Sequence, residues 1–463
     1  MTTPEPSLPR DLDQIAREVK AHIENAEVEP LLQLIAPLHP ADIAETMERL
    51  DRFEQNFLFD ALEPEVGSQV LLELEDATRE DVLEGLDEQR LGPMVDEMDS
   101  DDAADIVGEL DEEVRERVLQ QVPEEHRVEV ETLLTYPEDS AGGIMALEVP
   151  WVRKTHTVAR AIEMIREHHR DMEEISEIFV VDRERRLVGS ILPVELLLAD
   201  PDALVADIMD TEAVSVRPET DQQEAAAVAS KYDLLNVPVT DDRNRLLGVI
   251  TYDDIFDVIE EEEHEDISYI AGTGEDEPAE RSVMKAVRER GPWLMLGLGG
   301  SIGSAMVMAA FEGSLKQHLA VAFFVPAVMA TAGSVAIQAS SLVVRGLATG
   351  SFALQGVPIV LWRELRTSVL LGVGLGILLG LFAFVWMGNG ALALCLLSAL
   401  GLVVINAALS GTMIPLALKR VGIDPAVAMG PFITTLNDVM GIAIYLLVVL
   451  LFLSGQAPAA ALQ

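Results

Sequence analysis

The C-terminal part of the chain contains the stretch PFITTLNDVMGIAIYLLVVLLFL, which runs from Pro431 to Leu453. It is long and apolar enough to cross a bilayer as a helix, which takes about 20 residues. Asp438 is its only charged residue, and no other charge lies so deep inside a long apolar segment. A carboxylate at mid-bilayer costs roughly 2.5–3.5 kcal/mol and as a rule faces a partner or a water-filled path. Asp438 is therefore a candidate ligand for a cation inside the membrane.

The position of Asp438 on its helix supports this interpretation. Thr434, Asp438, Gly441 and Tyr445 recur at helical spacing and so form one stripe, with Asn437 beside it. The predicted membrane spans contain no Lys or Arg that could pair with the carboxylate. A lone buried aspartate bonded to a neighbouring helix is the alternative; we favour an ion or water as its partner.

Four further apolar stretches are long enough to cross a membrane. The five predicted spans are Gly291–Phe311, Leu319–Val344, Thr367–Trp386, Ala391–Leu418 and Ala426–Leu453. Lys and Arg gather before the first span, between the second and third, and after the fourth. The positive-inside rule therefore predicts a cytoplasmic N-terminal half and an outside C-terminus, with the spans embedded in membrane lipid.

Two of the spans are unusual in composition. The first is rich in Gly and Ser between Gly297 and Ser304, which favours close helix packing. The second carries Gly333 and Gln338 among several hydroxyl side chains, which is more polarity than packing requires. The residues that we predict to line a pore with Asp438 are Gly333, Gln338, Asn437 and Gly441.

Charge divides the chain into two parts. Residues 1–280 contain 22 Lys and Arg against 74 Asp and Glu, whereas residues 281–463 contain 10 against 5. So acidic a half repels nucleic acid and attracts cations; solubility or adaptation to salt is the alternative explanation. The single cysteine, Cys395, excludes an intramolecular disulfide and a cysteine-type zinc site. Met1–Lys20 has no apolar core, so we expect no signal peptide.

The acidic half begins with a repeat. An apolar residue recurs every 12 positions from Leu38 to Leu134, in most cases followed by a helix-start signal such as Pro or an acidic residue. This period predicts a superhelix of short helices over residues 26–135, preceded by a disordered segment at residues 1–25.

A second repeat follows at a shift of about 59 residues, because Ile178–Ile191 resembles Val237–Ile250. Each copy is expected to run strand, helix, strand, turn, strand, helix. The repeat resembles a pair of CBS modules, at residues 136–200 and 201–260, a regulatory unit that often binds adenine nucleotides such as ATP. Thr251 and Asp254 match the ribose contacts of that family, while the first copy lacks them. A CBS pair without nucleotide is the alternative.

The link between the two halves is acidic. Residues 252–270 have the apolar spacing of a helix and carry at least seven carboxylates, whose mutual repulsion at i, i+4 disfavours the helix unless cations neutralise it. Mg²⁺ prefers oxygen ligands and keeps much of its water, so loose carboxylate clusters suit it. We therefore predict a cation-sensitive connecting helix and linker at residues 254–280; a merely solvated helix is the alternative.

The whole arrangement resembles the MgtE family of magnesium channels. The resemblance covers nearly the whole chain in order and rests on several motifs together. They are YPEDSAGGIM (residues 136–145), MDSDDAAD (98–105), ATAGS (330–334) with Gln338, RGLA (345–348), WREL (362–365) and LNDVMG (436–441).

The resemblance implies a multi-domain membrane protein of the bacterial inner membrane: an α-helical superhelical domain, an α/β CBS pair, a connecting helix and a bundle of five transmembrane helices at residues 281–463. It implies a homodimer with one pore on the two-fold axis, where Asp438 holds hydrated Mg²⁺ near the backbone at Thr434. Cytosolic Mg²⁺ would then bridge the soluble parts and close the pore. The regulatory ligands implied are Asp101, Asp105, Gly143 by its carbonyl, Glu195, Asp233, Asp254, Asp257, Glu262, Glu265 and Asp266. Gln223 stands where an acid is expected.

We therefore predict a Mg²⁺-selective, Mg²⁺-gated homodimeric channel. A proton-coupled divalent-cation transporter with Asp438 as its proton site is one alternative, and a membrane-anchored nucleotide sensor is another. An enzyme is disfavoured, because the eight histidines are scattered and no nucleophile–base set is visible.

Overall fold

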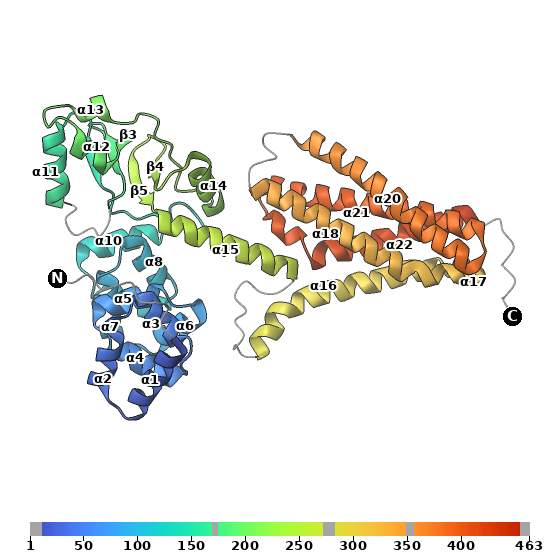
Figure 1. Cartoon of the computed structure of the whole chain (residues 1–463), viewed down its shortest axis with the longest axis horizontal. Coiled ribbons are helices and arrows are strands. Elements are labelled where there is room, and N and C mark those ends of the chain that lie inside the picture. Colours follow the sequence, from blue (N-terminus) through green and yellow to red (C-terminus); the bar gives the residue numbers. More distant parts are fainter. Residues whose placement is uncertain (1–11, 169–174, 272–282, 349–355, 454–463) are drawn as a thin grey trace. The chain divides into compact units, whose positions relative to one another are not determined.

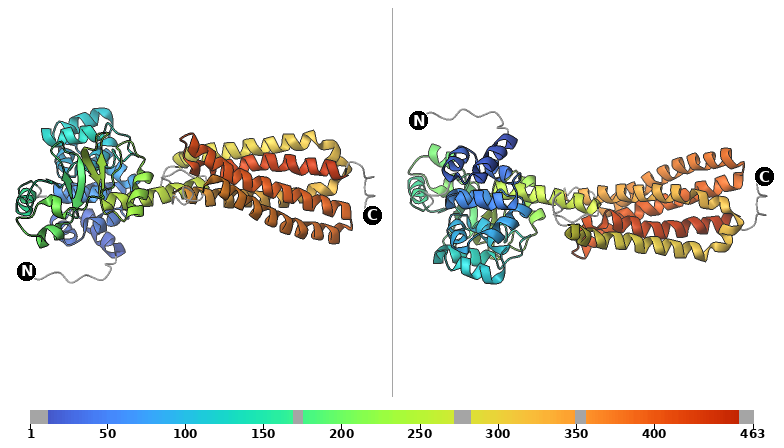
Figure 2. Two further views of the ribbon diagram at one scale, coloured as in Figure 1. Left: turned by 90° about the horizontal axis from the view of Figure 1, so that it is seen from above. Right: turned by 90° about the horizontal axis from the view of Figure 1, so that it is seen from below.

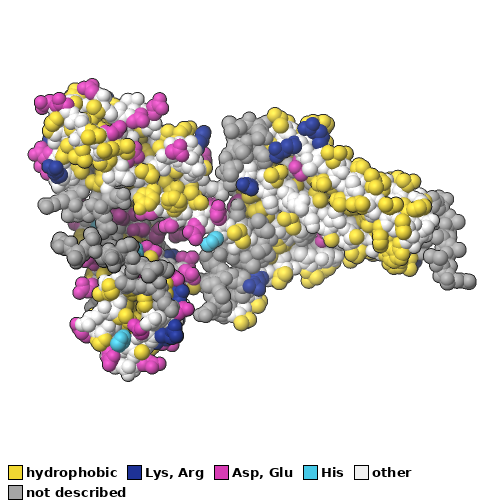
Figure 3. Space-filling view, in the orientation of Figure 1, with side chains coloured by type: hydrophobic (Ala, Val, Ile, Leu, Met, Phe, Trp, Pro, Cys, Tyr) yellow, Lys and Arg dark blue, Asp and Glu magenta, His cyan; other side chains and the backbone are white. Residues whose placement is uncertain are grey.

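The computed structural model describes residues 12–168, 175–271, 283–348 and 356–453. The chain forms two compact units, residues 1–259 and 260–463, and each is considered by itself. Figure 3 shows Asp and Glu side chains spread over the first unit and mainly apolar side chains on the second.

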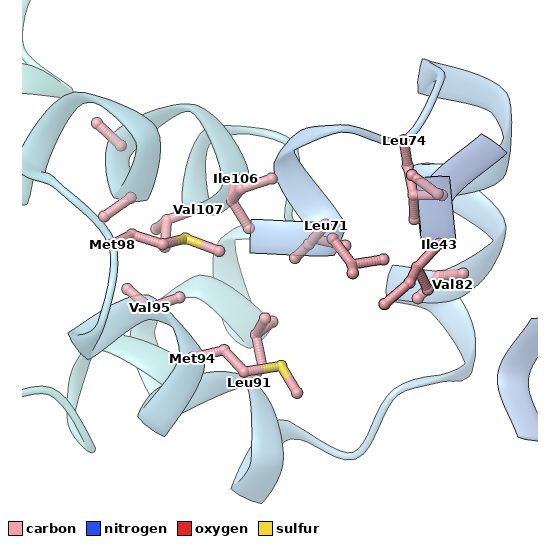
Figure 4. Close-up of a cluster of buried hydrophobic side chains, with 14 of the residues drawn as sticks. Ile43, Leu71, Leu74, Val82, Leu91, Met94, Val95, Met98, Ile106 and Val107 are labelled. Carbon is pink, nitrogen blue, oxygen red and sulfur yellow. The ribbon is translucent and has the colours of Figure 1, made fainter. Parts of the chain in front are cut away.

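The first unit begins with short helices that follow the predicted 12-residue period. Leu38, Leu50, Leu62, Leu74 and Met98 are buried where one helix gives way to the next, so the period marks the residues that anchor each turn in the core. Figure 4 shows part of this core. The helices are α1 (Leu12–Glu24), α2 (Val28–Ile35), α3 (Pro40–Met47), α4 (Arg52–Ala61), α5 (Pro64–Leu72), α6 (Asp76–Gly85), α7 (Glu88–Asp96), α8 (Ser100–Gly108), α9 (Glu112–Leu119) and α10 (Glu124–Leu133). Successive odd-numbered helices from α3 to α9 pack on one another, as expected for a superhelix. Most of the short helices are labelled in Figure 1.

The prediction of disorder over residues 1–25 is wrong for residues 12–24. They form α1, which buries Ile15, Ala16, Val19 and Ile23 against the helical core. These four residues have the spacing of one helical face, a signal that the 12-residue period does not contain. Residues 1–11 lie outside the described part of the chain.

The second repeat folds as two related modules. The elements are β1 (Trp151–Arg153), α11 (Val158–His168), β2 (Ile178–Val181), β3 (Leu187–Ile191), α12 (Pro193–Leu198), α13 (Val205–Ile208), α14 (Gln222–Tyr232), β4 (Val237–Thr240) and β5 (Leu246–Ile250). The pairing Ile178 with Ile191 in one hairpin recurs as Val237 with Ile250 in the other, each followed by a register shift at the same place. The first strand is present only in the first copy; in the second, Val216 makes a single parallel bridge to Val239.

The second repeat leads directly into the connecting helix, α15 (Tyr252–Ala271), as predicted. Its Ile255 and Val258 are buried against the first unit, which fixes one face of the helix. The predicted linker beyond it, residues 272–280, lies outside the described residues.

The second unit contains five helices that are long and apolar enough to cross a membrane. Its elements are α16 (Val283–Ala310), α17 (Glu312–Gln317), the 3₁₀ turn η1 (Leu319–Phe324), α18 (Val325–Ala348), α20 (Val357–Met387), α21 (Gly390–Arg420), η2 (Pro425–Ala428) and α22 (Pro431–Leu453). The long helices lie side by side as a bundle (Figure 2). α20 begins ten residues before the predicted third span, because its first turns include the charged residues Arg363, Glu364 and Arg366.

Glycine allows α20 and α21 to pack backbone to backbone. A Cβ added at Gly376 would lie 2.7 Å from the carbonyl oxygen of Leu397, and one at Gly380 would lie 2.8 Å from that of Ala393. Such contacts are closer than any real Cβ tolerates, so a side chain at either position forces the helices apart.

Gly376→Ala is therefore expected to destabilise the bundle by about 1–3 kcal/mol, because the added methyl group overpacks the contact. The matched control is Gly374→Ala two residues away, where an added Cβ meets nothing within 4 Å. The control should be neutral or slightly stabilising, since Ala is the better helix former. Thermal unfolding of the two variants in detergent tests this, and equal melting temperatures would contradict it.

Candidate functional site

Acidic residues of α8 and α15 form a cluster in the first unit, which we call the acidic cluster: Asp101, Asp102, Asp105 and Asp254. Asp101 is only 5% exposed, and one of its carboxylate oxygens accepts a hydrogen bond from the backbone N–H of Asp102 at 3.0 Å. Asp101 and Asp105 are one helical turn apart, so both face the same way.

Asp254 enters the cluster from the first turn of α15. Its carboxylate accepts a hydrogen bond from the backbone N–H of Thr251 at 3.1 Å, and another from the Thr251 hydroxyl. These two bonds cap the helix and fix the carboxylate in place. The predicted nucleotide contacts Thr251 and Asp254 are thus bonded to each other, and Asp254 is also part of the acidic cluster.

Burial and neighbouring carboxylates raise the pKa of every member of the cluster. Burial, and then the Asp254 carboxylate, raise the pKa of Asp102 to about 8 and that of Asp105 to about 7. Burial raises the pKa of Asp254 to about 6. Burial, and then the Asp254 carboxylate, raise the pKa of Asp101 well above its usual range. Among the described residues, the largest influences on the pKa values of Asp101, Asp102 and Asp254 include no Lys or Arg, whereas Arg79 lowers the pKa of Asp105. The cluster therefore favours protons or cations.

A cavity of about 100 Å³ lies beside the cluster. Asp105, Arg115, Tyr136, Glu138 and Gly143 are among its lining residues. Gly143 has no room for a side chain, because an added Cβ would lie 2.4 Å from the carbonyl oxygen of Pro137. The structure thus brings two residues predicted separately, Asp105 and Gly143, to one hollow.

The cluster does not form a finished coordination sphere. Among the described residues, no three Asp, Glu, His or Cys side chains come close enough to hold one ion. Mg²⁺ keeps several of its waters, so it can be held through them by carboxylates that do not all reach the ion. The donor set is all oxygen and fits a hydrated Mg²⁺ better than a dehydrated transition metal.

The other predicted ligands are spread more widely. Asp257 lies one turn beyond Asp254 and adds to its pKa shift. The Glu195 carboxylate accepts a hydrogen bond from the backbone N–H of Leu192 at 3.0 Å. Asp233 caps the C-terminus of α14 in a left-handed conformation. In the described residues nothing joins these last two to the acidic cluster. Glu262, Glu265 and Asp266 lie on the part of α15 that belongs to the second unit.

Sequence reasoning missed two members of this region, Asp102 and Glu138. Asp102 lies inside the quoted motif MDSDDAAD, and Glu138 inside YPEDSAGGIM. The sequence shows that both residues are acidic. A linear motif does not show which of several neighbouring acids comes close to Asp254 or to the rest of the cluster in the folded chain.

A polar face lies on the second unit. Thr331, Ser334, Gln338, Ser341 and Arg345 recur at helical spacing along α18, and all are exposed or half-exposed. Thr331 and Ser334 bond carbonyls of their own helix. Asp438 of α22 is also half-exposed, and the Cγ2 atom of Thr434 lies 4.0 Å from a Cβ added at Gly333. We call this surface the polar face; lipid contact along it would be costly, so it calls for water or a partner.

Two of the predicted pore residues do not belong to this face. Asn437 is fully buried, and Gly441 is enclosed by Val403 and Met329. Successive residues of a helix point about 100° apart, so Asn437 turns into the bundle when Asp438 turns out of it. A path along the polar face would therefore be lined by Asp438, Thr434, Gly333 and Gln338, and not by Asn437 or Gly441.

Tyr445 also points inward, although it shares the predicted stripe. Its hydroxyl donates a hydrogen bond to the carbonyl oxygen of Val321 at 2.8 Å, and its side chain is fully buried. This bond ties α22 to the η1 turn. Tyr445→Phe is therefore expected to lower stability by about 0.5–1.5 kcal/mol, because it leaves the Val321 carbonyl without this donor. Thermal unfolding checks this. An unchanged melting temperature would mean that the bond contributes nothing.

Comparison with known proteins covers both units. Models of three domain families match: an MgtE divalent cation transporter at residues 325–448, an MgtE intracellular N domain at 38–139 and CBS domains at 141–201 and 205–261. The magnesium transporter MgtE of Bacillus subtilis is 35% identical over 68% of this chain and 70% of its own length. That of Thermus thermophilus is 37% identical over 71% and 73%. The structure of the cytosolic domain of the Mg²⁺ channel MgtE in complex with ATP aligns with 52% of this chain and 99% of that domain, at 32% identity and a TM-score of 0.50.

Proposed function

Because the chain belongs to the MgtE family of magnesium transporters, we propose that it is a Mg²⁺-selective channel of the inner membrane that cytosolic Mg²⁺ closes. The observation that carries this proposal is Asp438, which is half-exposed on a polar face of an otherwise apolar bundle. Hydrated Mg²⁺ is the cargo, and the carboxylate holds it through its waters.

The polar face supports a pore between two copies of the chain. Thr331, Ser334 and Gln338 lie on α18 and Asp438 on α22, two helices that pack against each other. Two such faces opposed across a two-fold axis would cover the polar side chains and enclose a path with one carboxylate from each subunit. Formation of the homodimer would thus remove the polar side chains from lipid and enclose the pore at the same time.

The charges of the second unit support the proposed orientation. On the view in Figure 3 the basic side chains of the bundle gather toward one of its ends, which agrees with a cytoplasmic end under the positive-inside rule. Arg345 lies in the last turn of α18, and Lys419 and Arg420 lie in the last turn of α21. The first unit and α15 would then lie in the cytoplasm, and the C-terminus outside.

The acidic cluster supports the proposed gate. Without cations, Asp254 of α15 repels Asp101, Asp102 and Asp105 of α8. Mg²⁺ that neutralises these carboxylates would remove the repulsion, and therefore favours the state in which they lie close together. We propose closure of the pore as the consequence, with Gly143, Glu195, Asp233, Asp257, Glu262, Glu265 and Asp266 as further ligands.

ATP is a second proposed ligand of the soluble half. The related cytosolic domain was solved in complex with ATP, and Thr251 and Asp254, which match the ribose contacts of the CBS family, lie at the turn between β5 and α15. Because Asp254 also belongs to the acidic cluster, a nucleotide that bound to this residue would change the affinity of the cluster for Mg²⁺.

Flux into liposomes tests the proposal against its main alternative. The full-length protein should carry Mg²⁺ down an imposed electrical gradient at uniform pH, with currents that fall when Mg²⁺ is added to the side bearing the soluble half. A carrier that couples Mg²⁺ to protons would instead need a pH gradient. Flux that follows only the pH gradient would overturn the channel proposal.

A further inference from the structure

Four polar side chains in the described part of the second unit have enclosed atoms without a hydrogen-bond partner. They are Ser304 of α16, Ser340 of α18, Asn406 of α21 and Asn437 of α22. Asn437 stands out, because it is fully buried and neither Nδ2 nor Oδ1 is bonded. These atoms are enclosed by their own chain, so a second subunit cannot reach them. Buried polar groups are as a rule paired, and an unpaired one calls for an explanation.

Helix geometry places Asn406 and Asn437 at about one level of the bundle, on the faces by which α21 and α22 approach each other. A Cβ added at Gly441 of α22 would lie 3.3 Å from Cγ1 of Val403 of α21, which sets the two helices in register. α21 and α22 are joined by the short segment around η2 and run in opposite directions. Asn406 comes three residues after Val403, and Asn437 four residues before Gly441. Because the helices are antiparallel, both displacements run in the same direction along the bundle, by about 4.5 Å on α21 and about 6 Å on α22. Each residue stays on the same face of its helix as Val403 or Gly441.

The unpaired atoms decide what could lie between the two amides. They are the Nδ2 groups of Asn406 and Asn437, which donate, and Oδ1 of Asn437, which accepts. The two side chains are not bonded to each other. A cation would be repelled by the two N–H₂ groups and would meet a single unpaired oxygen, Oδ1 of Asn437. A water molecule can accept from one amide and donate to the other, and enclosed waters make about three such bonds.

We propose that each subunit encloses ordered water between α21 and α22, held by the amides of Asn406 and Asn437 behind the polar face. The water site stands independently of the transport proposal. Its consequence for Asp438 rests on the proposed function: holding Asn437 inward keeps the next residue turned outward. Asn437 is then a positioning residue for the pore carboxylate.

A double-mutant cycle tests whether the two amides share one site. Asn437→Leu and Asn406→Leu replace each amide by an apolar group of the same shape, and each alone strands the other amide. We expect each single variant of the full-length protein in nanodiscs to melt roughly 2–6 °C lower. The double variant should melt near the parent, because both polar partners are then gone. Losses that simply add would overturn the shared site.

Thr412→Val is the matched control on α21. Thr412 is fully buried, as Asn437 is, but its hydroxyl bonds the carbonyl of Ala408 at 2.8 Å within the same helix. Its loss strands no partner on a neighbouring helix, so the melting temperature should change little.

A density map of the unmodified protein tests the water directly, even where a variant fails to fold. At a resolution that shows ordered solvent, a peak should lie within hydrogen-bond distance of both amides. Amides bonded to each other, with no density between them, would overturn the proposal. Failure here would remove the water site and the positioning role of Asn437, but would leave the proposed transport standing, because loss of uptake on Asp438→Asn tests the polar face and not the water.

Discussion

Replacement of Asp438 by asparagine is expected to reduce Mg²⁺ uptake about 100-fold or more. The variant keeps the size of the side chain and removes its charge, which in the proposed dimer happens on both sides of the path. A hydrogen bond to a charged group contributes about 1.5–3 kcal/mol, and each 1.4 kcal/mol is a factor of ten. Growth of Mg²⁺-starved cells and Mg²⁺ influx into liposomes measure the effect.

Glu312→Gln is the matched control for this experiment. It also removes one carboxylate from the second unit, but Glu312 is exposed and pairs only with the exposed Lys316, one turn along α17, among the described residues. Uptake should be unchanged in the control. The Asp438→Glu variant should retain part of the activity, because it keeps the charge and moves it by one methylene. If Asp438→Asn supports growth as well as the parent does, the proposed path is wrong.

Asp101→Asn is expected to remove most of the effect of Mg²⁺ on the soluble half. Asparagine keeps the oxygen that accepts from the N–H of Asp102 and removes one of the charges that repel Asp254. Without divalent ions at pH 8 the variant should therefore resist proteolysis better than the parent. Addition of millimolar Mg²⁺ should protect the parent strongly and the variant little.

The same cluster predicts a dependence on pH. The pKa of Asp102 is raised to about 8, that of Asp105 to about 7 and that of Asp254 to about 6, each from 3.8. Between about pH 4 and pH 8 the folded cluster thus holds more protons than the unfolded chain does. Stability conferred by this protonation is present at low pH and is lost as the pH rises through the folded pKa values. Without Mg²⁺, the soluble half should melt roughly 5–10 °C lower at pH 8.5 than at pH 5.5.

Mg²⁺ should flatten this pH dependence, because it takes the place of the protons on the carboxylates. Glu116→Gln is the control, since Glu116 is an exposed acid of α9 outside the cluster and should leave both effects unchanged. Equal protection of the Asp101→Asn variant and the parent by Mg²⁺ would show that the regulatory ions bind elsewhere.

Most helices and strands could be predicted from the linear sequence, because the residue patterns that indicate them are local. The five spans rest on runs of apolar residues, and the hairpin of each CBS module rests on a repeat that recurs in the same register. The predicted and observed ends of these elements differ in places. At α20, for example, the helix begins in charged residues that the apolar run does not include. α1 was missed because its burial depends on four spaced residues and not on the period of the helices that follow it.

The sequence by itself determined the chemistry of this protein, and the tertiary structure decided where that chemistry points. Asp438 was visible because one charge in an apolar run is costly wherever the run lies. That Asn437, next to it, faces the interior depends on α21 packing against α22, a contact between distant residues. In the same way the acids of α8 and α15 were evident one by one, but their pKa shifts arise from burial and from charges that are adjacent only in the folded chain. Composition can be read along the chain, whereas burial and electrostatic coupling depend on distance in space. Only the fold could therefore show that Asp438 is partly exposed while Asn437 is buried, and that Asp101 lies close enough to Asp254 for their charges to interact.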